Sequence, residues 1–222
     1  MVTRKPAATR PVGLADKHRA ILAGALTVFA RDGYARTSID AIAADAGVST
    51  RTIYNHFPGK ARLFHALIIE SATLVAEAHI ALIDRYLHKV TDIEADLIEF
   101  GCIWATPIPG HADHFALVRH INADARHIPP ATIDAWQQAG PLRVRRELAR
   151  RLQQLADQGF LSVGNPERAA NHLVLLITVA NPSFPAATPT QQQITEMVTA
   201  GVRAFLYGYR ASPGITAGWA AE

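Results

Sequence analysis

Apolar residues recur at helical spacing along most of the chain, and Pro or Gly separates one apolar stripe from the next. The first stripe predicts a helix from Asp16, its N-cap, to Asp32, with Gly33 as the stop. No strand-like alternation extends beyond a few residues. The pattern therefore predicts an all-α protein of about nine helices, with the further ones at about 38–46, 49–57, 60–86, 92–105, 111–125, 130–158, 166–180 and 190–209.

Length and composition favour a folded protein of the cytoplasm. The chain has 222 residues, 49% of them hydrophobic, which is enough for a core and a small companion domain. No run reaches the roughly 18 uninterrupted apolar residues of a membrane span, and the N-terminus lacks the apolar run of a secretory signal. The single cysteine, Cys102, excludes an internal disulfide framework and fits a reducing compartment. We therefore expect a soluble cytoplasmic protein with no membrane partner.

Charge is distributed unevenly along the chain. Residues 1–62 carry ten Lys and Arg against four acids, whereas the remainder carries twelve against fifteen. Residues 1–13 are rich in Pro, Ala and Arg without periodicity, and they are predicted to form a disordered basic arm. The asymmetry predicts that the N-terminal part meets a polyanion, with a solvated surface and chance clustering as the alternative.

The segment 37–60 has the pattern of a helix-turn-helix. Thr37 or Ser38 caps a short helix, Gly47 falls where a tight turn needs positive φ, and Ser49 caps a second short helix that Pro58 and Gly59 end. A helix that enters the major groove needs small or polar side chains on its exposed face. The alternative is an ordinary helical hairpin with a polar outer face.

The second short helix has two chemically different faces. Thr50, Arg51, Tyr54 and Asn55 share one face, while the opposite face is apolar and would anchor the helix through Ile53 and Phe57. Arg51 is the best candidate for direct base reading, because a guanidinium pairs bidentately with guanine; Asn55 is a weaker candidate for adenine. The hydroxyl and imidazole groups on this helix suit phosphate oxygens, as does Lys60 at the start of the next helix.

Residues 14–67 closely resemble the DNA-binding domain of the TetR family. The resemblance lies in the runs FARDGYARTSID and IAADAGVSTRTIYNHFPGKARLF, which follow one another without a gap. It implies a dimeric transcriptional regulator, not an enzyme, that binds a double-stranded DNA operator. It also implies that DNA is touched by Thr37, Ser49, Thr50, Arg51, Thr52, Tyr54, Asn55, His56 and Lys60.

The back half resembles the AefR-like branch of TetR C-terminal domains more loosely, through the runs 118–161 and 165–177. The implied organisation is an arm at 1–13, a DNA-binding domain at 14–60, a ligand-binding and dimerisation domain at 61–210, and a tail at 211–222. The resemblance also implies an effector pocket among the fourth to seventh helices. Its candidate residues, which are equally the residue types of an ordinary core, are Phe100, Ile103, Trp104, Phe115, Val118, Arg119, Asn122 and Trp136.

The last two helices are apolar around more than one face, which predicts a partner on both sides. We therefore expect a homodimer through these helices, with burial inside one subunit as the alternative. The resulting hypothesis is a repressor that binds a palindromic operator and is released by a small, partly apolar effector. A small-molecule sensing module, or an activator with weak or atypical DNA binding, is the competing hypothesis.

Three other chemistries find little support. The His-rich stretch 111–127 could hold a metal, but no cysteine or obligatory partner cluster accompanies it, so neither a metal nor a cofactor is expected. Cys102 lies within a predicted helix rather than on the sharp turn of a nucleophile, and no glycine-rich phosphate loop is present. The basic run 143–151 reads as a solvated helix face.

Overall fold

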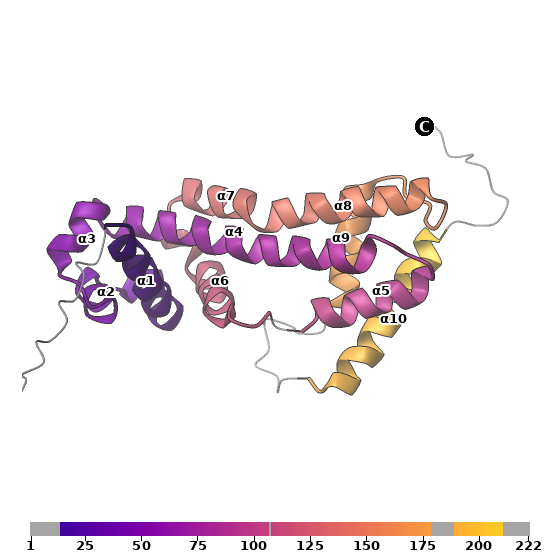
Figure 1. Cartoon of the computed structure of the whole chain (residues 1–222), viewed down its shortest axis with the longest axis horizontal. Coiled ribbons are helices and arrows are strands. Elements are labelled where there is room, and N and C mark those ends of the chain that lie inside the picture. Colours follow the sequence, from indigo (N-terminus) through magenta and orange to yellow (C-terminus); the bar gives the residue numbers. More distant parts are fainter. Residues whose placement is uncertain (1–13, 107, 179–188, 211–222) are drawn as a thin grey trace, which may run out of the picture. The chain divides into compact units, whose positions relative to one another are not determined.

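The expected all-α class is confirmed. The structure, a computed structural model, describes residues 14–106, 108–178 and 189–210, which form helices and no strand (Figure 1). The predicted arm at 1–13 and tail at 211–222 lie outside these residues. The elements in chain order are α1 (Leu14–Arg36), α2 (Ile39–Asp45), α3 (Thr50–His56), α4 (Lys60–Leu87), α5 (Ile93–Trp104), α6 (Ala112–Asp124), the 3₁₀ turn η1 (Ala125–His127), α7 (Pro130–Ala139), α8 (Pro141–Asp157), α9 (Pro166–Ile177) and α10 (Gln191–Tyr209).

Side-chain caps fix where several helices begin. The side chains of Ser38, Ser49, Asp92, Asn165 and Thr190 each accept a hydrogen bond from a backbone N–H in the first turn of the following helix. The first N–H groups of a helix have no partner within it, so each cap provides an acceptor for a donor that would otherwise bond to water. The helix starts predicted at Ser49 and Asn165 are thereby confirmed.

The single helix predicted over 130–158 is wrong. α7 ends at Ala139 and α8 begins at Pro141, because a proline inside a helix removes one backbone donor and clashes with the carbonyl four residues earlier. Gly140 between them leaves helical geometry, with φ −114° and ψ −95°. Gly140 packs closely against α4, because a Cβ added to Gly140 would lie 3.1 Å from the Cβ of Ala72.

The N-cap predicted at Asp16 is also wrong. α1 already runs from Leu14, and Asp16 lies in its first turn, where a carboxylate still favours the positive end of the helix dipole. Gly33 does interrupt the helix as expected, with φ 77° and ψ 170°, and a short helical stretch then continues to Arg36.

The chain divides into two compact units. One contains 14–68 and 113–129, and the other contains 69–112 and 130–210. α4 therefore contributes its first nine residues to the first unit, and α6 groups with the first unit although it lies far along the sequence. The predicted domain boundary between residues 60 and 61 stays a prediction; the compact units divide after Ile68, and the first one includes 113–129.

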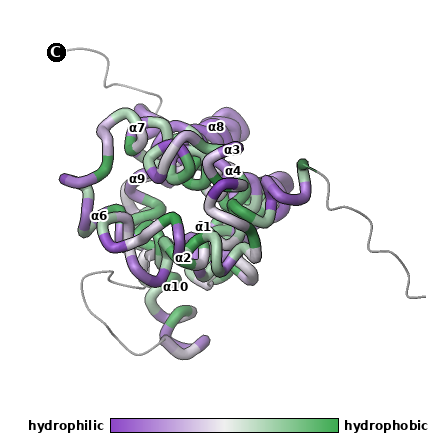
Figure 2. The backbone as a smooth tube through the Cα atoms, turned by 90° about the vertical axis from the view of Figure 1, so that its left-hand side faces the viewer, coloured by the Kyte–Doolittle hydropathy of each residue, from purple (hydrophilic) through white to green (hydrophobic). Residues whose placement is uncertain are grey.

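The second unit has one continuous apolar core. α8 packs on α9, α9 on α10 and α10 on α5, and the buried side chains come from all of these and from α4. Hydrophilic and hydrophobic residues are mixed along the helices seen in Figure 2, as expected for helices that bury one side. α9 and α10 cross closely, because a Cβ on Gly201 would lie only 2.1 Å from the carbonyl oxygen of Leu176.

α4 is long and apolar enough, by length and composition alone, to cross a membrane, with a mean hydropathy of 1.7 over 18 residues. Many of its apolar side chains are nevertheless buried inside the protein, although Leu74 is 52% exposed and 39% of the 18-residue window is buried. Leu63 and Phe64 are buried in the first unit, and Ile83 and Leu87 belong to the core of the second. These positions are typical of a core helix.

Candidate nucleic-acid interface

α3 has an apolar anchor and a polar outer face, as the sequence predicts. Ile53 is fully buried, and Phe57, which caps the C-terminal end, is 6% exposed. Arg51 and Asn55 are exposed, and Tyr54 is 57% exposed. The helix therefore presents a guanidinium, a phenol and an amide outward while its other side is fixed to the domain.

The turn between α2 and α3 has the geometry of a helix-turn-helix. Gly47 has φ 64°, and the Val48 N–H donates to the carbonyl of Ala43 at 3.0 Å. Ser49 then caps α3 by accepting from the Thr52 N–H at 3.1 Å, and the hydroxyls of Ser49 and Thr52 lie 2.9 Å apart. These two hydroxyls, both predicted to touch phosphate, stand side by side at the start of α3.

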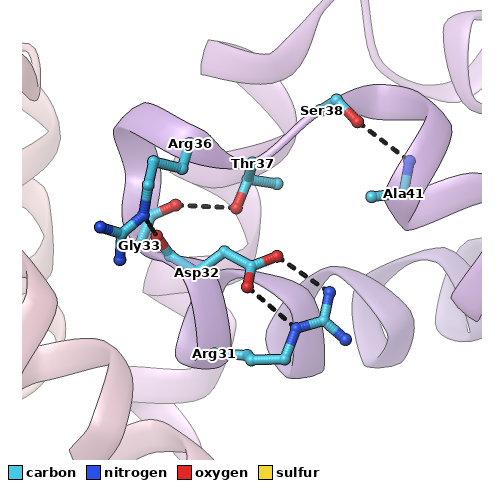
Figure 3. A network of polar contacts seen from close by, with 7 residues as sticks. All are labelled: Arg31, Asp32, Gly33, Arg36, Thr37, Ser38 and Ala41. Atoms are coloured by element: carbon cyan, nitrogen blue, oxygen red, sulfur yellow. Dashed lines mark hydrogen bonds and ion pairs between the residues drawn. The ribbon is translucent and has the colours of Figure 1, made fainter.

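A polar network holds the elbow between α1 and α2 (Figure 3). The Thr37 hydroxyl donates to the carbonyl of Gly33 at 2.7 Å, and Arg36 donates to the carbonyl of Asp32 at 3.0 Å. Arg31 donates twice to the Asp32 carboxylate, at 2.9 Å each, and these bonds lower the pKa of that carboxyl. Thr37 is 4% exposed, so its hydroxyl is buried in the elbow, where it is bonded to the backbone of Gly33.

Lys60 is tied to the same elbow. Its ammonium donates to the carbonyl of Thr37 at 2.8 Å and to that of Ala35 at 3.3 Å, and it lies 4.8 Å from the ring centre of Tyr34. Burial lowers the pKa of Lys60. An ammonium has three N–H donors, so two carbonyls still leave one for a phosphate oxygen.

Ring contacts at two places in this unit do not follow from the sequence. The ring of His18 on α1 lies against the rings of His56 and Phe57, and Tyr34 packs 4.7 Å from Phe64. Both join residues distant along the chain, so no local spacing could have indicated them.

The effector candidates are divided between the two units. Phe100, Ile103 and Trp104 on α5 and Trp136 on α7 belong to the second unit, with Phe100 fully buried and Ile103 37% exposed. The α6 residues belong to the first unit, where Arg119 and Asn122 are exposed and the other two are half-buried, namely Phe115 and Val118.

His79 on α4 adds a polar group beside the α5 candidates. Its ring lies 4.6 Å from that of Trp104, which in turn lies 5.4 Å from Phe100. Nδ1 of His79 donates to the carbonyl of Val75 at 2.9 Å, and burial lowers the pKa of the imidazole. The indole N–H of Trp136 is buried without a hydrogen-bond partner among the described residues.

The His-rich stretch 111–127 does not gather into a metal site within the described residues, where no group of three or more potential ligands comes together. His114 is buried. His120 and Asp124 lie against Gly33 instead, each within 3.1 Å of where its Cβ would be.

Two family models match the chain. The model of bacterial regulatory proteins of the tetR family matches residues 21–67, and that of the AefR-like transcriptional repressor C-terminal domain matches residues 109–211. The chain belongs to the TetR family of DNA-binding transcriptional regulators, a family of regulators and not of enzymes.

Individual relatives agree with this assignment. The HTH-type transcriptional regulator Rv1556 of Mycobacterium tuberculosis is 25% identical over 190 residues, which cover 86% of this chain and 88% of that protein. A TetR-family regulator from Mesorhizobium loti superposes with a TM-score of 0.78 at 26% identity, covering 91% of this chain and all of that one. The flavonoid-responsive regulator FrrA superposes with a TM-score of 0.63 at 26% identity, covering 88% and 98%.

Proposed function

We propose that the protein is a homodimeric repressor that reads a palindromic operator through α3. The observation that carries this proposal is the two-sided character of α3, with Ile53 buried and Arg51, Tyr54 and Asn55 exposed. Such a helix fits the major groove, where Arg51 reads guanine and Asn55 reads adenine. Thr50 lies on the same face.

Phosphate contacts flank the recognition helix. Ser49 and Thr52 stand at its N-terminus, where backbone N–H groups and the helix dipole already favour an anion. Lys60 and His56 provide cationic or donor groups at its other end, and the buried Thr37 positions Lys60 through its carbonyl. These contacts fix the register of α3 on DNA, because phosphates carry no sequence information themselves.

Dimerisation uses the faces of α9 and α10 that the subunit leaves uncovered. Leu175 is 66% exposed, Leu176 42%, Met197 52% and Tyr207 98%. The small residues Ala200, Ala204 and Gly208 are exposed on α10 between or beside them. An apolar strip of this kind suits a second copy, and two copies place two α3 helices about one DNA turn, roughly 34–36 Å, apart.

The effector binds in the second unit near α5. Phe100 and Trp104 provide aromatic groups with the imidazole of His79 beside them. Trp136 on α7 of the same unit has an indole N–H without a hydrogen-bond partner among the described residues. Such groups suit a small, partly apolar, aromatic molecule with a few polar groups, and FrrA responds to flavonoids. Binding releases DNA by changing the separation of the two α3 helices in the cytoplasmic dimer.

The test is selection of duplexes from random-sequence DNA by the purified full chain, followed by mobility shifts at several salt concentrations. Selection should enrich a palindrome, and affinity should fall steeply with salt because several phosphates are neutralised. The double variant Tyr54→Ala, Arg51→Ala should lose the shift, while Arg145→Ala, an exposed arginine on α8, should keep it. Selection that enriches no sequence would favour a sensing module over a regulator of this kind.

A further inference from the structure

The DNA-binding unit contains a pair of imidazoles contributed by two different helices. His18 on α1 and His56 on α3 have ring centres 5.8 Å apart at an interplanar angle of 62°. His18 also lies 5.1 Å from the ring of Phe57, whose side chain is buried. The two imidazoles are thus held by ring contacts and both remain half-buried, with part of each ring facing solvent.

The ring nitrogens of this pair are not engaged by the rest of the domain. Throughout the described ranges, no protein group forms a hydrogen bond with the imidazole nitrogens of His18 or His56. Edge-on and tilted ring contacts fix the ring planes and leave the N–H groups for a partner from outside the chain.

The surroundings of the pair carry positive rather than negative charge. Lys17 and Arg19 flank His18 and are exposed, and the nearest acid on that helix, Asp16, pairs with Arg19. α3, the Phe57–Gly59 turn and the first turn of α4 contain no acidic residue, while Arg51, Lys60 and Arg62 add cations. Two adjacent imidazoles in such a setting favour an anion, and the anion that reaches the end of α3 is a DNA phosphate.

We propose that His18 and His56 together form a two-histidine phosphate site that extends the DNA interface from α3 onto α1. This inference rests on the proposed function, since it requires α3 to lie on DNA. A ring N–H of either imidazole can donate to a phosphate oxygen beside the pair. The pair therefore adds a phosphate contact on α1 to the contacts made by α3.

The experiment measures binding of the full chain to its selected duplex, and to duplexes of unrelated sequence, by fluorescence anisotropy over a salt series. We expect His18→Phe to weaken binding by about fivefold to tenfold, because one hydrogen bond to a phosphate is lost. The loss should be similar for all duplexes, as expected for a contact to the DNA backbone. His88→Gln, at an exposed histidine just after α4, serves as the control and should behave as the unsubstituted protein.

His18→Phe separates phosphate contact from packing, because it keeps a ring against Phe57 but has no N–H. If His18→Phe binds DNA as tightly as the unsubstituted chain, His18 acts through packing alone and the proposal is wrong. A loss confined to the selected duplex would overturn it as well, because a phosphate contact does not depend on sequence. Failure to select any duplex would instead reject DNA binding by α3, so the two proposals fail in distinguishable ways.

Discussion

The ammonium of Lys60 and the backbone carbonyl of Thr37 are joined by a hydrogen bond of 2.8 Å, which links the start of α4 to the elbow between α1 and α2. The same residue also reaches Ala35 and the ring of Tyr34. Lys60 thus ties the segment that follows α3 to the segment that precedes α2. Its position in the fold gives it a structural part in addition to the phosphate contact proposed for it.

Lys60→Met should therefore destabilise the folded chain as well as weaken DNA binding. Hydrogen bonds from a charged donor contribute about 1.5–3 kcal/mol, and the freed carbonyls lie beside the elbow. Urea denaturation should show a loss of about 1–2 kcal/mol. Arg62→Met, which removes an exposed cation two residues away, should leave the free energy of unfolding nearly unchanged. Equal stability of the two variants would show that the bonds of Lys60 contribute nothing.

Gly33→Ala should disrupt the first unit. At φ 77° and ψ 170°, Gly33 occupies a region that is almost restricted to glycine, and a Cβ would lie 3.1 Å from both His120 and Asp124 of α6. Backbone strain alone costs about 1–3 kcal/mol. Gly47→Ala is the matched control, since φ there is 64° with nothing within 4 Å of a Cβ.

Thermal unfolding should rank Gly33→Ala well below Gly47→Ala, because only the first adds a steric clash to the strain. If both variants lose the same stability, the side chains of His120 and Asp124 move aside for the added Cβ at little cost in free energy. In that case the strain of the backbone accounts for the whole effect.

The sequence was sufficient wherever the determining signals are local. Ser49, Gly47 and Pro58 mark the ends of α3 through capping and backbone conformation, and these depend on neighbours within four residues. The break at Gly140 and Pro141 was missed because apolar periodicity continues through it. Pro141 nevertheless disfavours a continuous helix, because it lacks a backbone N–H and clashes with the preceding turn; this effect outweighs the apolar periodicity there.

The remainder depended on contacts between distant segments. That His18 meets His56, that His79 meets Trp104, and that Lys60 meets Thr37 follows from helix packing, which no spacing along the chain encodes. The grouping of α6 with the first unit is of the same kind. Side chains that act across helices were therefore invisible until the fold was known.

Charge placed on the uncovered strip of α9 and α10 should abolish dimerisation. Leu175→Glu and Tyr207→Glu alter side chains that are 66% and 98% exposed, so the subunit itself tolerates them. A glutamate buried in an apolar interface loses its solvation without gaining a partner charge. Sedimentation velocity should report a monomer for either variant, with far-UV circular dichroism unchanged.

Leu14→Glu, at a residue that is 77% exposed on α1, is the control for an added charge outside the strip and should remain dimeric. A dimer that persists in both α9 and α10 variants would place the interface elsewhere. Loss of the dimer in Leu14→Glu would show that added charge acts without regard to position.

His79 should make the stability of the second unit depend on pH. Burial lowers the pKa of the folded imidazole below its ordinary value of 6.5, so the unfolded chain binds the proton more readily. The stability that the neutral ring contributes is then fully present above pH 6.5 and is lost as the pH falls through the folded value. His79→Phe retains an aromatic ring beside Trp104 but cannot be protonated, so its stability should fall less between pH 7 and pH 5. The measurement is urea denaturation at three pH values, with His88→Gln as the exposed control. A pH dependence shared equally by the unsubstituted chain and His79→Phe would assign the effect to other groups.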